Sequence, residues 1–138
     1  MPVIPMITKE QFGGRTSMDL FSMLLEERII MLCGEINQDM ASLLVSEILY
    51  LSAKDEKTPI TIYIHSPGGA VHAGLAIFDI MKKVPNPIIT IGMGLCASMA
   101  AFLLASGDKR YALENTEIMI HQPLGGSEGQ VSDMEITI

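Results

Sequence analysis

The stretch PITIYIHSPGGAVHAG, from Pro59 to Gly74, decides the fold class of this chain. Its first six residues include three isoleucines and a threonine, and this β-branched composition predicts a strand. The glycine-rich segment HSPGG then ends the strand sharply. Beyond it, apolar residues recur at helical spacing, at Val71, Leu75, Phe78 and Met81. A strand that turns through such a segment into a helix indicates an α/β domain.

The same alternation continues on both sides of this stretch. Short apolar segments predict further strands at residues 29–33, 87–94, 110–113 and 117–120. Because strands and helices alternate along the chain, the strands are expected to form a largely parallel sheet. The expected fold class is therefore α/β.

Helices are expected between these strands. Asn37 can cap a long helix, one face of which would carry Met40, Leu43, Leu44, Ile48 and Leu51. Ser17 can cap an earlier helix, and another is expected to begin at Ser98 and end at Gly107.

The expected organisation has three parts. Residues 1–16 contain several prolines and glycines and predict a flexible, irregular arm. Residues 17–121 predict an α/β head domain, and residues 122–138 begin a further element that this sequence does not complete. With 138 residues, of which 49% are hydrophobic, one core-forming domain is expected.

Composition excludes several classes of function. A net charge of −7, no basic run and only 5% aromatic residues argue against nucleic-acid binding. No signal peptide and no membrane span are expected, and no nucleotide, metal or other cofactor motif is present. Cys33 and Cys96 form no CxxC motif and predict reduced thiols in the core, so a reducing compartment is expected, the cytoplasm first and an organelle interior second.

Ser98 is the candidate for chemistry, in the run GLCASMAAFLL from Gly94 to Leu104. It would stand at a strand-to-helix turn, as would the HSPGG segment, and such turns meet at the carboxyl ends of parallel strands. The backbone N–H groups of Gly69 and Met99 could then form an oxyanion hole. Taken alone, the pattern is more typical of a capping or core serine than of a nucleophile.

A serine nucleophile needs a base, and the sequence contains three histidines. His121 follows an apolar strand and is the first candidate, because it would lie at a strand end. His65 also ends a strand and is the second. His72 would lie in the first turn of a helix, which favours a structural role.

Several blocks taken together resemble the proteolytic subunit of the Clp protease (the ClpP family): IYIHSPGGAVHAGLAIFD, GLCASMAAFLLASG and MIHQPLGG. The resemblance runs from about Ile4 to the last residue. It implies a serine peptidase with a crotonase-like fold of repeated β-β-α and β-α units and a partial handle element.

The resemblance also implies roles for individual residues. Ser98 occupies the position of the nucleophile and His121 that of the general base, while Gly69 and Met99 supply the N–H groups of the oxyanion hole. A peptide substrate would bind as an added strand along the segments that contain Gly68, Val71, Leu124 and Gly125.

The partners that the resemblance implies are unfolded polypeptides and a ring-shaped AAA+ unfoldase of the ClpX, ClpA or ClpC type. The family assembles as two stacked seven-membered rings, here of one chain or of mixed subunits. Residues 1–16 would line the axial pore, and Tyr63 lies in the region where family members form apolar pockets that dock the unfoldase.

The sequence also departs from the family pattern. The acid of the catalytic triad lies well beyond the histidine in the family, and this sequence ends at Ile138, before that segment. Asp133 belongs to the start of the handle helix and is not assigned to the triad, and His65 replaces the usual asparagine. The alternative to an active protease subunit is therefore a catalytically impaired structural or regulatory subunit of a mixed ring. A third hypothesis is a crotonase-fold enzyme that acts on acyl-CoA.

Overall fold

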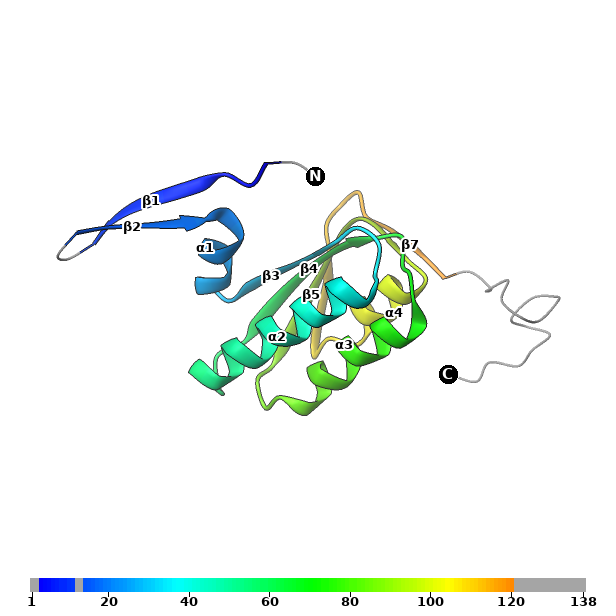
Figure 1. Ribbon diagram of the computed structural model, residues 1–138. Helices are drawn as coiled ribbons and strands as arrows, with labels where there is room; N and C mark the ends of the chain where they lie inside the picture. The colour runs from blue at the N-terminus through cyan, green and yellow to red at the C-terminus, as the bar shows by residue number, and fades with distance from the viewer. Residues whose placement is uncertain (1–2, 12–13, 121–138) are drawn as a thin grey trace, which may run out of the picture.

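A computed structural model describes residues 3–11 and 14–120 of the chain. Its centre is a five-stranded sheet in which β3, β4, β5 and β6 follow one another and β7 also pairs with β5 (Figure 1). The strands are β3 (Ile29–Cys33), β4 (Ile60–Ser66), β5 (Ile88–Ala97), β6 (Lys109–Ala112) and β7 (Glu117–Met119). All four pairings are parallel, which confirms the expected α/β architecture.

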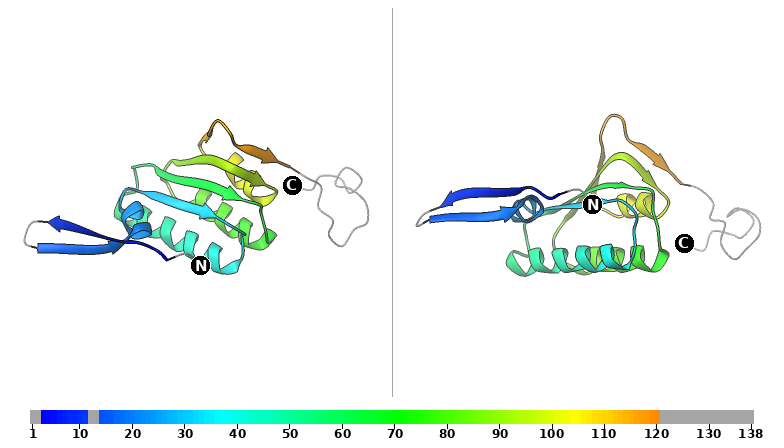
Figure 2. Two further views of the ribbon diagram at one scale, coloured as in Figure 1. Left: turned by 90° about the horizontal axis from the view of Figure 1, so that it is seen from above. Right: turned by 45° about the horizontal axis from the view of Figure 1, so that its top comes forward.

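Three helices cover one face of this sheet, and no helix of the described residues lies on the other face (Figure 2). They are α2 (Gln38–Lys54), α3 (Val71–Lys83) and α4 (Met99–Ala105). The strand residues that face them are fully buried: Ile30, Leu32, Ile60, Ile62, Ile64 and Ile88. Burial of these branched side chains between sheet and helices is the main stabilising contribution to the fold.

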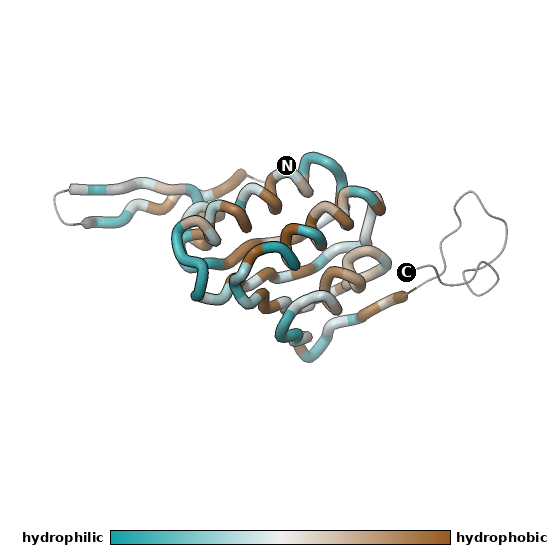
Figure 3. Tube along the Cα trace, turned by 90° about the horizontal axis from the view of Figure 1, so that it is seen from below, coloured by the Kyte–Doolittle hydropathy of each residue, from teal (hydrophilic) through white to brown (hydrophobic). Residues whose placement is uncertain are grey.

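Helix α2 begins as its sequence predicts. The side-chain oxygen of Asn37 accepts a hydrogen bond of 2.9 Å from the amide of Met40, which caps the helix. The buried face contains Leu44, Ile48 and Leu51, as expected, whereas Leu43 is 64% exposed. Figure 3 shows apolar residues alternating with polar ones along the longer helices, as expected for helices that bury one side.

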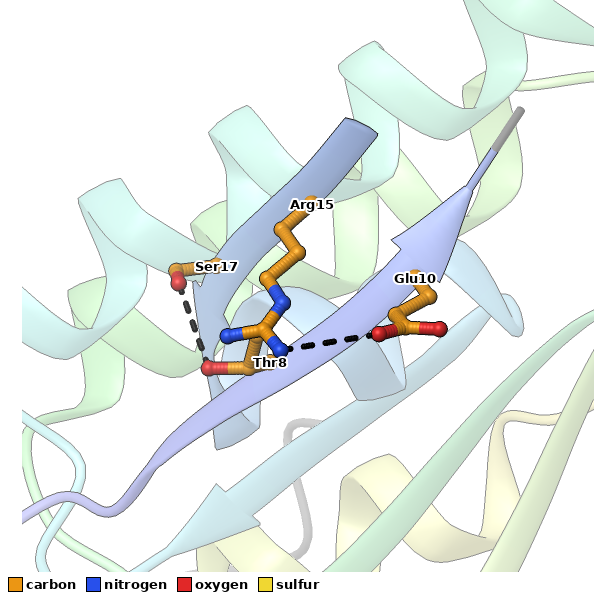
Figure 4. A network of polar contacts seen from close by, with 4 residues as sticks. All are labelled: Thr8, Glu10, Arg15 and Ser17. Atoms are coloured by element: carbon orange, nitrogen blue, oxygen red, sulfur yellow. Dashed lines mark hydrogen bonds and ion pairs between the residues drawn. The ribbon is translucent and has the colours of Figure 1, made fainter. Parts of the chain in front are cut away.

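The N-terminal segment is more regular than expected. Strands β1 (Met6–Gln11) and β2 (Gly14–Asp19) form an antiparallel hairpin, so the irregular conformation predicted for residues 1–16 is wrong at residues 6–11 and 14–16. Two of its cross-strand pairs make polar contacts (Figure 4): Thr8 with Ser17 at 3.3 Å and Glu10 with Arg15 at 3.6 Å. Both pairs are exposed, so they stabilise the hairpin little.

Helix α1 (Leu20–Glu26) follows β2 directly. Its cap is Asp19 and not Ser17, because the Asp19 carboxylate accepts hydrogen bonds from the amide and the hydroxyl of Ser22. Ser17 instead pairs across the hairpin.

Within the described residues, no helix is both long and apolar enough to cross a membrane.

The loop between α2 and β4 is fastened by side chains from elsewhere in the chain. The Arg28 guanidinium donates to carbonyl oxygens of this loop and of the end of α2, those of Leu51, Asp55, Thr58 and Pro59. The Asn86 amide nitrogen donates to two of the same oxygens. Within the loop, hydrogen bonds from the Thr58 hydroxyl and the Lys57 amide lower the pKa of Asp55 to about 2.

We expect this carboxylate to make stability pH-dependent in the acid range. Its pKa falls from 3.8 to about 2 on folding, so its contribution is complete above about pH 4 and is lost as the pH falls toward 2. Asp55→Asn should therefore be less stable than the wild type near neutral pH, and the difference should shrink in acid. Urea denaturation at a series of pH values measures this.

Glu56→Gln is the matched control, because Glu56 is an exposed neighbouring acid that makes no hydrogen bond with any described residue. It should leave the pH dependence unchanged. If Asp55→Asn lost stability in acid as steeply as the wild type does, the role of Asp55 would be refuted.

Candidate active site

Ser98 has the backbone conformation that distinguishes this region. It joins β5 to α4 with φ 56° and ψ −121°, and the only other non-glycine residue with positive φ in the described part is Arg28. Such a conformation costs a non-glycine residue about 1–3 kcal/mol and persists only where the surroundings impose it. The Ser98 side chain is half-buried and makes no capping hydrogen bond, so the hydroxyl does not cap α4.

Hydrogen bonds on both sides fix this conformation. The Ser98 amide donates to the carbonyl of Met119 in β7 at 2.9 Å, and the Ser98 carbonyl accepts the first bond of α4, from Phe102, at 3.1 Å. The parallel pairing of β7 with the end of β5 places Met119 beside Ala97. Strand β7 therefore stabilises the strained turn.

The glycine-rich turn after β4 packs directly against Ser98. Gly68 has φ 100°, and a Cβ atom there would lie 2.8 Å from the Ala97 carbonyl oxygen and 2.9 Å from the Ser98 Cβ. Gly69 has φ 154° and leaves no room for a side chain, because the backbone of Ile36 passes against it. Ile36 donates to the Gly68 carbonyl at 2.8 Å and accepts from Ala70 at 2.9 Å. The glycine-rich turn therefore approaches Ser98 and Ile36 with backbone atoms alone, because Gly68 and Gly69 have no side chains.

The amide groups of these turns are available as donors. Neither Gly69 nor Met99 donates a hydrogen bond to another residue in the part of the chain that the structure describes. Met99 is the first residue of α4, where the N–H group has no partner within its own helix. A half-buried hydroxyl beside two such N–H groups is an arrangement that acyl transfer can use.

The three histidines have different positions. His121 lies outside the described residues, as do Leu124 and Gly125, but Met119, two residues before His121, is bonded to Ser98. His72 is exposed in the first turn of α3, and it lines an open groove of about 440 Å³ between α2 and α3.

His65 has a role that the sequence analysis missed. Its ring lies against Gly94, and its Nδ1 accepts a hydrogen bond of 3.0 Å from the amide of Leu95. The register of β4 with β5 shifts at this point. Ile64 pairs with Gly92, and Ser66, two residues later, pairs with Cys96, four residues later. His65 thus supports the irregular part of β5 that precedes Ser98, and Gly94 beside it leaves room for the ring.

The remaining candidates are placed as follows. Val71 is 60% exposed at the start of α3, so its side chain is accessible to a ligand.

The two cysteines differ in burial. Cys96 is buried, and its thiol donates a hydrogen bond of 3.1 Å to the Ile64 carbonyl. Cys33 is exposed, so its predicted position in the core is wrong. Among residues 3–11 and 14–120, no three His, Cys, Asp or Glu side chains cluster as metal ligands.

The chain is similar to known proteins over a range that includes all of these candidate residues. The sequence pattern of the family described as Clp protease matches residues 12–138. The chain is also 51% identical, over 139 aligned residues, to the ATP-dependent Clp protease proteolytic subunit 2 of Bacillus licheniformis. That alignment covers 99% of this chain and 73% of the relative.

The backbone contact at Gly68 predicts a large effect of one added methyl group. Gly68→Ala should cost about 1–3 kcal/mol for backbone strain, and about 1–3 kcal/mol more for the overlap with Ala97 and Ser98. Gly34→Ala is the matched control, because Gly34 has φ 88° and no atom lies within 4 Å of the place that the new methyl group would take. Urea denaturation of both variants compares the two losses, and equal losses would contradict the packing argument.

Proposed function

The chain belongs to the Clp protease family, and from this premise we propose that Ser98 is the nucleophile that cleaves the peptide bond. Family membership makes the chain a serine endopeptidase, the proteolytic subunit of an ATP-dependent protease with a crotonase-like α/β fold. The observation that carries the assignment to Ser98 is its strained conformation at the β5–α4 turn, with a hydroxyl that caps nothing. Such strain is characteristic of functional residues.

In the proposed reaction, His121 accepts the hydroxyl proton as Ser98 Oγ forms a bond to the substrate carbonyl carbon. The amide groups of Gly69 and Met99 donate hydrogen bonds to the resulting oxyanion. The tetrahedral intermediate then collapses, the C–N bond breaks, and His121 returns the proton to the leaving amine. Water hydrolyses the acyl-enzyme by the same steps. The bond between Ser98 and Met119 supports the placement of His121, because it brings the chain to Ser98 two residues before the histidine.

The substrate in this proposal binds as an extended peptide. It lies between the segment that contains Gly68 and Val71 and the segment that contains Leu124 and Gly125, as an added strand. The exposure of Val71 and its position three residues after Gly68 support the first half of this cleft. Pairing through the backbone would make the enzyme tolerant of substrate side chains.

Proteins of this family form rings and work with Clp ATPases. The finer proposal is two stacked seven-membered rings, of this chain alone or mixed, with an AAA+ unfoldase of the ClpX, ClpA or ClpC type feeding unfolded polypeptides. Exposed apolar side chains support extensive subunit contacts. They lie on α2, α3 and the β6–β7 region: Leu43, Leu49, Tyr50, Leu75, Tyr111, Leu113 and Ile118.

The docking of the unfoldase is proposed on the sheet face that no helix covers. Tyr63 lies there in register with Met31 and Ile91, and all three are half-buried. Residues 1–16 are proposed to line the axial pore, residues 17–121 to form the head and 122–138 to begin the handle. A cytoplasmic location is proposed too, and the two free thiols fit a reducing compartment.

We expect a fluorophosphonate to form a single covalent adduct with the wild-type protein and none with Ser98→Ala. The phosphonate reacts only with a serine whose hydroxyl is activated by a base and an oxyanion hole. Intact-protein mass spectrometry measures the adduct. Ser46→Ala, which removes an exposed hydroxyl from α2, is the control and should be labelled like the wild type. A folded wild-type protein without an adduct would refute the assignment.

We also expect His121→Ala to slow labelling by about 10²- to 10⁴-fold, the usual contribution of a general base. His72→Ala is the matched control and should react at the wild-type rate. His65→Asn tests the second candidate, because asparagine keeps an acceptor for Leu95 but cannot serve as a base. If His65→Asn lost reactivity and His121→Ala did not, His65 would be the base.

A further inference from the structure

Gly74 lies inside helix α3, where neither a turn nor a positive φ requires glycine. Its amide donates to the carbonyl of Ala70 at 3.0 Å, as in a regular helix, and its φ lies in the ordinary range. Glycine inside a helix is less favourable than alanine, because more backbone freedom is lost on folding. A glycine here therefore needs another physical reason, and the space beside it provides one.

The side chain of Met99 occupies that space. A Cβ atom at position 74 would overlap Cγ and Sδ of Met99 and lie 3.2 Å from its Cε. Because Cγ is close to the Met99 backbone, rotation at the end of the side chain cannot relieve the overlap. Gly74 is buried and the half-buried Met99 side chain packs against the core, so a methyl group at position 74 would displace Met99.

This contact joins the two turns that carry the proposed oxyanion donors. Gly74 belongs to the first turns of α3, which are bonded through Ala70 to Ile36, and Gly69 lies directly before Ala70. Met99 opens α4 and contributes the other amide. The distance between the two N–H groups therefore depends on how closely α4 approaches the start of α3. Two glycines allow this close approach. Gly68 leaves room for Ser98, and Gly74 leaves room for the Met99 side chain.

We propose that Gly74 is a positioning residue for the oxyanion hole, because its missing side chain seats Met99 and so sets the spacing of the Gly69 and Met99 amides. This inference rests on the proposed function of those two amides. It adds a residue that contacts neither the nucleophile nor the substrate. It also assigns to the Met99 side chain a role separate from that of its backbone N–H group.

A double-mutant cycle with Met99→Ala tests the proposal, because truncating Met99 makes room for a Cβ atom at position 74. The readouts are the rate of fluorophosphonate labelling, split into the maximal rate and the half-saturating concentration, and the melting temperature. Gly74→Ala alone should lower the maximal rate by about 10²-fold, the effect of misplacing a reacting group by about 1 Å. The half-saturating concentration should change little.

In the Met99→Ala background the same substitution should have little effect on the rate. Its effect on melting temperature should also reverse sign. Gly74→Ala should lower the melting temperature of the wild type through the overlap, but raise that of Met99→Ala, because alanine favours the helix. Ala76→Gly is the matched control. It destabilises the exposed side of α3 without touching α4, so it should lower the melting temperature and leave the labelling rate unchanged.

The outcomes separate this inference from the proposed function. If the folded wild type is not labelled at all, the proposed function fails, and this inference fails with it. If the wild type and Gly74→Ala are labelled at the same rate, only the positioning role of Gly74 is overturned. Equal losses of rate in both backgrounds would also overturn it, since the loss would then not pass through the Met99 side chain.

Discussion

The close approach of the glycine-rich turn after β4 to the Ser98 turn is the constraint on which the site depends. In a parallel sheet the carboxyl ends of neighbouring strands meet at one edge, so the segments after β3, β4 and β5 converge there. Ile36, Gly69 and Ser98 come from those three segments. Backbones can approach this closely only where side chains are absent, and the glycines at positions 68 and 69 provide that absence. The fold therefore brings the two turns together, and the glycines allow them to touch.

The strain at Ser98 is the second feature, and the surrounding sheet holds it in place. Strand β5 pairs with two strands along the same edge: its first half with β6 and its second half with β7. The irregular register between these halves changes the course of β5, and the hydrogen bond from Leu95 to His65 supports the change. The carbonyl of Met119 in β7 then accepts a hydrogen bond from the Ser98 amide. A residue with an unfavourable φ is stable here because hydrogen bonds on both sides leave it no alternative conformation.

Much of the fold could be predicted from local patterns. Strand β3 has the expected bounds, and the cap of α2 is Asn37 as expected, because both depend on residues next to one another in the chain. The hairpin of β1 and β2 was missed, since its strands alternate poorly and contain few β-branched apolar residues. Cys33 and Leu43 were misplaced for another reason. An apolar residue in an amphipathic element is buried only if another element covers that side, and periodicity does not reveal this.

The amino-acid sequence by itself determined the α/β class, the two strand-to-helix turns and the identity of the candidate residues Ser98, Gly69 and Met99. These depend on local composition, and the family membership of the chain agrees with the α/β class. Only the tertiary structure decided that Ser98 has a positive φ and caps nothing, and that His65 supports β5. It also revealed that Gly74 makes room for Met99. Each of these facts depends on atoms far apart in the chain, which only the packing of sheet and helices brings into contact.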